Sequence, residues 1–232
     1  MEENTFVINV GRQLGSGGKE IGLRLADMFG IQCYDKELLV RAAKESGIDA
    51  DNFVNSDERK KGFRSFFSNF IPLIGSGDFY GNPISEETLF RIQSETIKKI
   101  AKEHSCIFIG RCADYVLRHK QRVANIFISA DKEDRIQRLC AKHDINRQAA
   151  EKLVSQGDAQ RSEFYNFYSD GIWGAAATYH LCINSSVMGI EGTTMFVAEF
   201  IEKKLGVSRL RQFPKIEALE STHYRRIIHT KR

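Results

Sequence analysis

A glycine-rich stretch between an apolar run and an amphipathic pattern is the part of this sequence best suited to chemistry. Residues 11–22 read GRQLGSGGKEIG and directly follow FVINV. A strand, a tight turn and a helix in succession gather backbone N–H groups and the positive end of the helix around an anion. Gly15, Gly17 and Gly18 suit such a turn, because a Cβ would block positive φ angles and the close approach of phosphate oxygens. The stretch therefore predicts a phosphate-binding loop, with a plain strand-to-helix turn as the alternative.

The same stretch departs from the general phosphate-loop pattern GxxxxGK[ST] at two positions. Gly18 and Lys19 fit the second half of the pattern, in which the lysine adds a positive charge beside the β and γ phosphates. Gln13 occupies the position of the pattern's first glycine, and Glu20 occupies the position of the Ser or Thr that holds Mg²⁺. We expect Glu20 to face solvent in the first helical turn, where the helix dipole favours negative charge. Ser16 is then the better candidate for a hydroxyl near the phosphates, and either Ser16 or Glu20 could lie near Mg²⁺.

A second cluster, GRCAD, follows an apolar segment at residues 110–114. An arginine at the carboxyl end of a buried strand faces the ligand cleft of an open α/β sheet, where its planar fork binds phosphate through two hydrogen bonds. Arg111 is therefore a candidate ligand for a substrate phosphate. The alternative is a structural ion pair between Arg111 and Asp114 across one helical turn.

A third cluster consists of Arg135 and the segment DAQR at residues 158–161. Arginines above a phosphate site neutralise the charge that develops on a transferring phosphoryl group. Arg135 and Arg161 are candidates for that role. Asp158 and Arg161 are three positions apart on one helix face, so an internal ion pair between them is the alternative.

Short apolar and β-branched segments supply the elements that must position these residues. They run continuously rather than alternating with polar residues, which is typical of strands buried on both faces of a parallel sheet. The predicted strands are residues 5–10, 31–35, 106–110, 123–130 and 179–185. Helical spacing of apolar residues lies between them, at 21–29, 89–100, 136–140 and 197–205, and Gly30 and Gly206 are placed to end helices. This alternation predicts a doubly wound α/β domain with five parallel strands.

Two intervals are too long to be simple crossovers between strands. Residues 36–105 separate the second and third predicted strands, and residues 131–178 contain the lid that we expect between the fourth and fifth. Both insertions are expected above the carboxyl edge of the sheet, where open α/β folds bind ligands. We predict one domain over residues 1–206, followed by a basic tail over residues 207–232.

The composition of 232 residues, 42% hydrophobic and 28% charged, is ordinary for a globular domain. The formal net charge is +4, but the tail holds seven basic residues against Glu217 and Glu220 and contributes +5, so the rest of the chain sums to −1. We expect a solvated or partner-contacting tail and no nucleic-acid partner.

The distribution of cysteine, histidine and apolar residues predicts a reduced, cytoplasmic protein. The five cysteines form no CxxC pair, and the six histidines show no metal-ligand spacing, so we expect no metal site built by protein alone. Residues 1–4 are acidic and polar, unlike the start of a signal peptide. The longest apolar stretch, residues 66–75, is far shorter than the roughly 20 residues that a membrane span needs, so no membrane partner is expected.

The motifs, in their order and spacing, resemble the cytidylate kinase-like family. The resemblance is carried by GSGGKEI, YDKELL, FRIQSE, GRCADYVL, the lid Asp and Arg, and LCINSS followed by GIEG, and it covers the chain up to about residue 205. It implies a P-loop fold of the nucleoside-triphosphate hydrolase type, in which the glycine loop binds ATP phosphates. It also implies that the insertion after the second strand binds an acceptor nucleotide and that lid arginines span donor and acceptor.

The resemblance assigns roles to individual residues. The donor-binding residues are Arg12 and Gly15–Lys19, and the family's loop lysine falls on Gly18, or on Lys19 if one residue is shifted. The acceptor-binding residues are Asp35, Arg41, Arg111, Asp114, Asp158 and Arg161, and the catalytic residues are Lys19, Arg135 and Arg161. The chain departs from the family at Cys112, where an Asp is expected, and at Val154, where a further lid arginine is expected.

These observations predict ATP-dependent phosphoryl transfer to a small acceptor, with Mg²⁺ arriving on ATP. A pyrimidine nucleoside monophosphate, CMP or dCMP, heads the candidates. Two alternatives stay open: a non-catalytic nucleotide-binding or regulatory module on the same fold, and a kinase for a different small acceptor. The aromatic run at residues 163–173 either stacks a base or packs a lid or a dimer, and a homo-oligomer is left open.

Overall fold

The computed structural model describes residues 5–35 and 86–210. Their centre is one parallel sheet of five strands in the order β2-β3-β1-β4-β5. The strands are β1 (Val7–Arg12), β2 (Gln32–Tyr34), β3 (Cys106–Ile109), β4 (Val123–Ser129) and β5 (Leu181–Asn184). β1 is the middle strand, so β2 and β3 lie on one side of it and β4 and β5 on the other. The carboxyl end of β1 is therefore at a topological switch point, the usual ligand site of such sheets.

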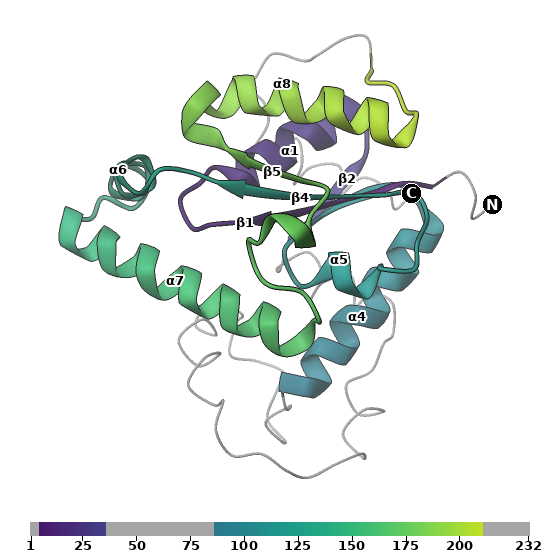
Figure 1. The fold of residues 1–232 in the computed structure, drawn as a ribbon, viewed down its shortest axis with the longest axis horizontal. Helices are drawn as coiled ribbons and strands as arrows, with labels where there is room; N and C mark the ends of the chain where they lie inside the picture. Colours follow the sequence, from purple (N-terminus) through teal and green to yellow (C-terminus); the bar gives the residue numbers. More distant parts are fainter. Residues whose placement is uncertain (1–4, 36–85, 211–232) are drawn as a thin grey trace, which may run out of the picture.

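Helices cover both faces of the sheet (Figure 1). Helices α1 (Gly18–Phe29) and α8 (Ser185–Leu205) lie on one face, and α4 (Glu86–Glu103) and α5 (Ala113–Val116) lie on the other. One apolar core joins the sheet to α1 and α8 through residues such as Ile21, Val197 and Ile201. A second core joins the opposite face to α4 and α5 through Ile97 and Val116. The sheet is thus held from both sides, and the ends of its strands are rigid platforms.

Two helices and a short turn connect β4 to β5. Helix α6 (Lys132–His143) packs against α7 (Arg147–Tyr168), and the 3₁₀ turn η4 (Ala176–Thr178) leads into β5. In Figure 1, α6 lies beyond the carboxyl end of β4, and α7 runs from there toward α4. Residues 131–178, predicted as a lid, therefore begin directly beside the glycine loop.

The predicted doubly wound parallel sheet is confirmed, and each predicted strand overlaps an observed one. Gly30 and Gly206 end α1 and α8 in the left-handed conformation, with φ of 63° at both, as their positions predicted. The sequence pattern was wrong about β5, which is only partly buried. Its position at the edge of the sheet is the reason, since only β4 pairs with it.

All five cysteines are free thiols, and three of them, Cys33, Cys106 and Cys112, are buried in the packed interior. Among the described residues, no helix has the length and apolar character needed to cross a bilayer. The predicted insertion at residues 36–105 is described only from residue 86 onward, where it forms α4.

Candidate functional site

The glycine stretch forms a tight loop between β1 and α1. Gly15 and Gly17 both adopt left-handed backbone angles, with φ of 79° and 78°. Gly17 is the N-cap of α1, and no side chain caps the helix there. The first N–H groups of a helix have no partner within the helix, and they attract anions together with the helix dipole. The loop therefore presents backbone donors at the carboxyl edge of the sheet.

Side chains are excluded at two positions of this loop by close neighbours. A Cβ on Gly15 would lie 2.7 Å from the carbonyl oxygen of Arg135, a backbone atom that cannot move cheaply. A Cβ on Gly17 would lie 2.0 Å from Cδ1 of Ile190. Because both residues have positive φ angles, the loop favours glycine at both positions on conformational grounds, and the Arg135 backbone adds a steric ground at Gly15.

Hydrogen bonds inside the loop engage Ser16 and Gln13. The buried Ser16 hydroxyl donates to the carbonyl oxygen of Gln13 at 2.9 Å, and the hydroxyl of Ser185 donates to the carbonyl oxygen of Ser16 at 2.7 Å. The amide of Gln13 donates to the carbonyl oxygen of Ile128 at 3.0 Å, and its side-chain oxygen accepts from the amide of Ala130 at 3.2 Å. The residue at the position of the pattern's first glycine therefore ties the loop to the end of β4.

Helices α6 and α7 hold the loop from the opposite side. The Arg135 guanidinium donates to the carbonyl oxygen of Leu14 at 2.8 Å and also pairs with Asp158. The Asp158 carboxylate accepts from the amide of Leu14 at 2.7 Å. Arg138, one turn after Arg135, donates to the carbonyl oxygen of Gly15 at 3.1 Å. Arg135 and Asp158 are thus engaged with the loop backbone and with each other, which gives both of them a positioning role.

The two charged residues that open α1 point in different directions. The Lys19 Nζ lies 2.7 Å from the Asp35 carboxylate, and the Lys19 side chain is 51% exposed. Glu20 is exposed and pairs with Arg24 one turn later, at 2.7 Å. The expectation that Glu20 faces solvent is confirmed. The Ser16 hydroxyl is bonded to the carbonyl oxygen of Gln13.

The guanidinium of Arg12 lies within electrostatic range of those of Arg111 and Arg161 beside the loop. Burial, followed by repulsion from Arg161 and Arg111, lowers the pKa of Arg12 to about 9, and attraction to Asp35 opposes the shift. Burial also lowers the pKa of Arg161, although Asp158 raises it. The Nη1 atom of Arg161 is buried, lies 3.9 Å from Asp158, and makes no hydrogen bond to the described residues. Repulsion of Arg12 by two other guanidinium groups means that this cluster favours an anion.

The turn after β3 presents Arg111 to the same region. Gly110, Arg111 and Cys112 are all left-handed, with φ of 72°, 67° and 53°. Non-glycine residues adopt this conformation at a cost, and such strain gathers at functional sites. The Arg111 guanidinium lies over the ring of Phe164, 5.4 Å from its centre.

Asp114, one turn after Arg111, is engaged by α7. Its carboxylate accepts a hydrogen bond from the Tyr165 hydroxyl at 2.5 Å. Burial raises the pKa of Asp114, and the bond from Tyr165 opposes that shift. The Asp114 carboxylate therefore joins the turn after β3 to α7.

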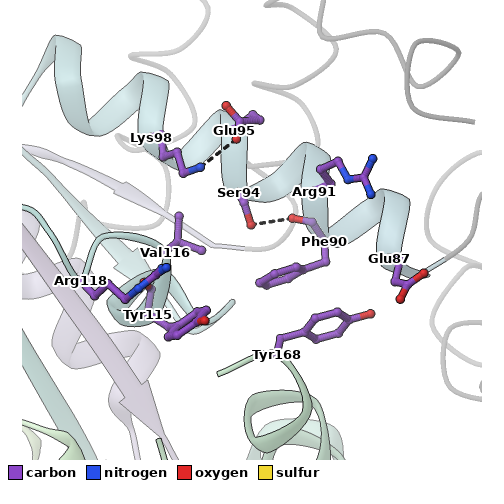
Figure 2. A pocket seen from close by; sticks show the side chains of 10 residues that line it. All are labelled: Glu87, Phe90, Arg91, Ser94, Glu95, Lys98, Tyr115, Val116, Arg118 and Tyr168. Atoms are coloured by element: carbon purple, nitrogen blue, oxygen red, sulfur yellow. Dashed lines mark hydrogen bonds and ion pairs between the residues drawn. The ribbon is translucent and has the colours of Figure 1, made fainter. Parts of the chain in front are cut away.

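An aromatic groove lies next to this turn, between α4, α5 and the end of α7. Figure 2 shows the rings of Phe90 and Tyr168 facing each other, and their centres are 4.1 Å apart with an interplanar angle of 19°. Phe164 meets Phe90 edge-on at 6.0 Å. The groove has a volume of about 440 Å³ and is also lined by Tyr115 and Arg118. The rings of Phe164 and Tyr168, from the aromatic run, thus pack against α4, in line with the packing alternative.

Residues 7–187 match the model of the cytidylate kinase-like family. The chain belongs to this family. The resemblance predicted from the motifs is therefore confirmed, and family membership supports phosphoryl transfer as the general class of activity. No curated protein matches the chain.

Solved structures share the fold of this cytidylate kinase-like chain. A protein from Eubacterium ventriosum, described as uncharacterized, has a TM-score of 0.65 at 24% identity, over 85% of this chain and 99% of its own. A shikimate kinase from Acinetobacter baumannii has a TM-score of 0.48 at 12% identity, over 87% of this chain and 95% of its own. The first of these likenesses supports the fold.

The structure brings most of the predicted site residues of this family member to one edge of the sheet. The loop residues, Asp35, Arg111 and Arg161 meet there, while Arg41 lies outside the described residues. Sequence reasoning missed Arg138 and Tyr165. The three-residue spacing from Arg135 could have indicated Arg138, whereas the aromatic run at residues 163–173 includes Tyr165 but gave no sign that it bonds Asp114. Within the described ranges, no group of three or more potential metal-ligating residues occurs.

Proposed function

We propose that this protein transfers the γ-phosphoryl group of ATP to a small acceptor, with CMP or dCMP as the first candidate. The observation that carries the proposal is the junction of the uncapped start of α1 with the cationic cluster of Arg12, Arg111 and Arg161. The cluster supplies positive charge where a donor and an acceptor phosphate would meet. A cytoplasmic location belongs to this proposal.

The donor phosphates fit the cradle formed by Gly15–Lys19. The positive φ angles of Gly15 and Gly17 give the loop a tight turn in which successive backbone N–H groups can face phosphate oxygens. Lys19 is half exposed and adds charge at the rim of the loop, beside Asp35. Mg²⁺ would arrive with ATP and would offset the negative charge of the phosphates. The engaged Ser16 and Glu20 fit a metal carried by ATP and water better than one held by these side chains.

The acceptor phosphate fits Arg111 and the buried Nη1 of Arg161. Arg41 belongs to the same proposal, although it lies outside the described residues. Asp114 and Asp158 are already bonded, to Tyr165 and to Leu14 with Arg135. We therefore assign these two carboxylates to holding the site together and keep Asp35, whose partner Lys19 lies at the half-exposed rim of the loop, as the carboxylate that meets a substrate.

In the proposed reaction, an oxygen of the acceptor phosphate attacks the γ phosphorus in line with the leaving group. The new P–O bond forms as the bond from the γ phosphorus to the β–γ bridging oxygen breaks, which releases ADP and the phosphorylated acceptor. Such transfers require little covalent chemistry from a protein, so positioning and charge neutralisation carry the rate. Arg161 and Arg111 would contact the equatorial oxygens, while Arg135 keeps the loop in place.

An ADP-release assay across nucleoside monophosphates tests the proposal. We expect release that depends on the acceptor and is fastest with CMP or dCMP, together with a labelled product when the γ-phosphoryl group of ATP carries the label. Lys19→Ala should slow turnover, because it removes charge from the rim of the loop. Turnover with a non-nucleotide acceptor alone would move the assignment to a kinase for another small molecule.

A non-catalytic nucleotide-binding module is the second candidate, and one observation favours it. Helix α1 begins at Gly18, which has no side chain to contact a phosphate, and the Lys19 amine is paired with the Asp35 carboxylate. Measurable ATP binding without ADP release, for every acceptor tested, would establish this candidate and overturn the kinase assignment.

A further inference from the structure

The side chain of Arg12 fills the space beside the first residue of α1. A Cβ built on Gly18 would lie 2.5 Å from Cβ and 3.0 Å from Cγ of Arg12, and 3.4 Å from Cβ of Ile128. The first distance is shorter than side-chain carbons tolerate, and the second is tighter than most such contacts. A side chain at position 18 would therefore start in the volume that Arg12 occupies.

The guanidinium of Arg12 extends from β1 across the end of β3. A Cβ on Gly110 would lie 2.1 Å from Nη1 and 3.3 Å from Cζ of Arg12. Since β1 and β3 are neighbours in the sheet, the charge of Arg12 lies at the carboxyl edge, between the glycine loop and the turn that carries Arg111. Glycine at position 110 leaves the room that this guanidinium needs.

Lys19 has a different orientation. Its Nζ pairs with Asp35, which follows β2, and half of the side chain is in solvent. By contrast, Arg12 is partly buried and lies closer to the centre of the sheet, since β1 is the middle strand. Of these two cations, Arg12 is the one at the topological switch point.

We propose that Arg12 performs the task of the phosphate-loop lysine in this protein, binding the terminal phosphates of the donor, and that Gly18 is required because Arg12 takes the space of a side chain there. In the general pattern the lysine stands where the helix opens, and α1 opens at Gly18. A guanidinium presents a planar fork that can contact two phosphate oxygens at once. The repulsion of Arg12 by Arg111 and Arg161 is relieved by a phosphate bound beside Arg12. This inference rests on the proposed function.

Calorimetric titration with a non-hydrolysable ATP analogue tests the proposal. Arg12→Gln should weaken binding by about tenfold or more, because it removes a charge-assisted hydrogen bond. Arg12→Lys should lose less affinity for the analogue than Arg12→Gln does. Lys19→Gln should also lose less affinity than Arg12→Gln. Arg147→Gln is the matched control, since Arg147 is an exposed arginine that pairs with Glu133 and Glu151. Each variant is compared with the wild type by its thermal unfolding midpoint.

An exchange of the two side chains makes the test sharper. Arg12→Gly frees the space beside Gly18, so the double variant Arg12→Gly with Gly18→Lys should regain binding that Arg12→Gly alone has lost. A double variant that binds no better than Arg12→Gly, an Arg12→Gln variant that binds like the wild type, or a larger loss from Lys19→Gln would overturn the inference. Absence of analogue binding in the wild type would instead overturn the proposed function itself.

Discussion

The contact between Asp158 and the glycine loop leads to a specific stability prediction. Asp158→Ala removes the acceptor of the Leu14 amide, at 2.7 Å, and the partner of the Arg135 guanidinium. The side chains of Arg135 and Asp158 are only 6% and 18% exposed, so water compensates little for the loss. The substitution therefore leaves a buried charge and a backbone N–H without their partners.

The expected loss follows from these two unpaired groups. Removing one member of a buried ion pair costs about 3–5 kcal/mol, and the partial exposure of Asp158 favours the lower end of that range. For a chain of this size, a loss of about 3 kcal/mol lowers the unfolding midpoint by roughly 6–12 °C. Asp158→Asn should cost less, because the amide oxygen can still accept from the Leu14 amide, although the NH2 group then faces the Arg135 guanidinium.

Urea and thermal unfolding, followed by circular dichroism, measure this effect. Glu133→Ala is the matched control. The Glu133 carboxylate of α6 also pairs with Arg147 of α7, but both side chains are exposed to solvent. That variant should unfold close to the wild type, since exposed ion pairs contribute little. If Asp158→Ala unfolds at the wild-type urea concentration but loses affinity for the acceptor, Asp158 contacts the substrate and does not anchor the loop.

Three further variants test other parts of the site. Gly15→Ala should destabilise the protein by roughly 1–3 kcal/mol and abolish ATP binding, because the new Cβ meets the Arg135 carbonyl oxygen and the φ angle is positive. Glu20→Gln should change the affinity for Mg·ATP less than about twofold, because Glu20 faces solvent. Asp114→Asn should flatten the pH dependence of stability. The folded pKa of Asp114 is raised above 3.8, so its stabilising contribution is present below that pH and is lost as pH rises through the folded value.

Each of these variants has an outcome that contradicts the assignment. Normal ATP affinity in Gly15→Ala would show that the loop is not part of the ATP-binding site. A strong loss of Mg·ATP affinity in Glu20→Gln would make Glu20 a metal ligand. Equal slopes of the urea midpoint against pH, in Asp114→Asn and the wild type, would show that burial of the carboxylate does not shift its pKa.

Local patterns in the sequence were sufficient to predict the sheet and the glycine loop. The β-branched runs that became β1, β3 and β4 are buried almost throughout, and Gly30 ends α1 because the backbone there is left-handed. These features depend on residues that are close together in the sequence. The helix α7 was not predicted as one element, because its apolar residues are few and spread over 22 positions.

Long-range pairing explains what the sequence could not predict about the site. The ion pair that the three-residue spacing of Asp158 and Arg161 indicated is present, but the contact of Asp158 with Leu14 joins residues 144 positions apart and could not be read from spacing. Asp158 pairs with Arg135, while Arg161 lies 3.9 Å away. The orientation of Arg12 depends in the same way on the space left by Gly18 and Gly110.

The central claim is that the loop of Gly15–Lys19 binds the phosphates of a nucleoside triphosphate. An NMR titration of the ¹⁵N-labelled protein with Mg·ATP, and separately with adenosine, tests it most directly. We predict that the backbone amide signals of Gly17, Gly18 and Lys19 shift strongly with Mg·ATP and remain in place with adenosine. Signals of these amides that do not move at saturating Mg·ATP would contradict the claim.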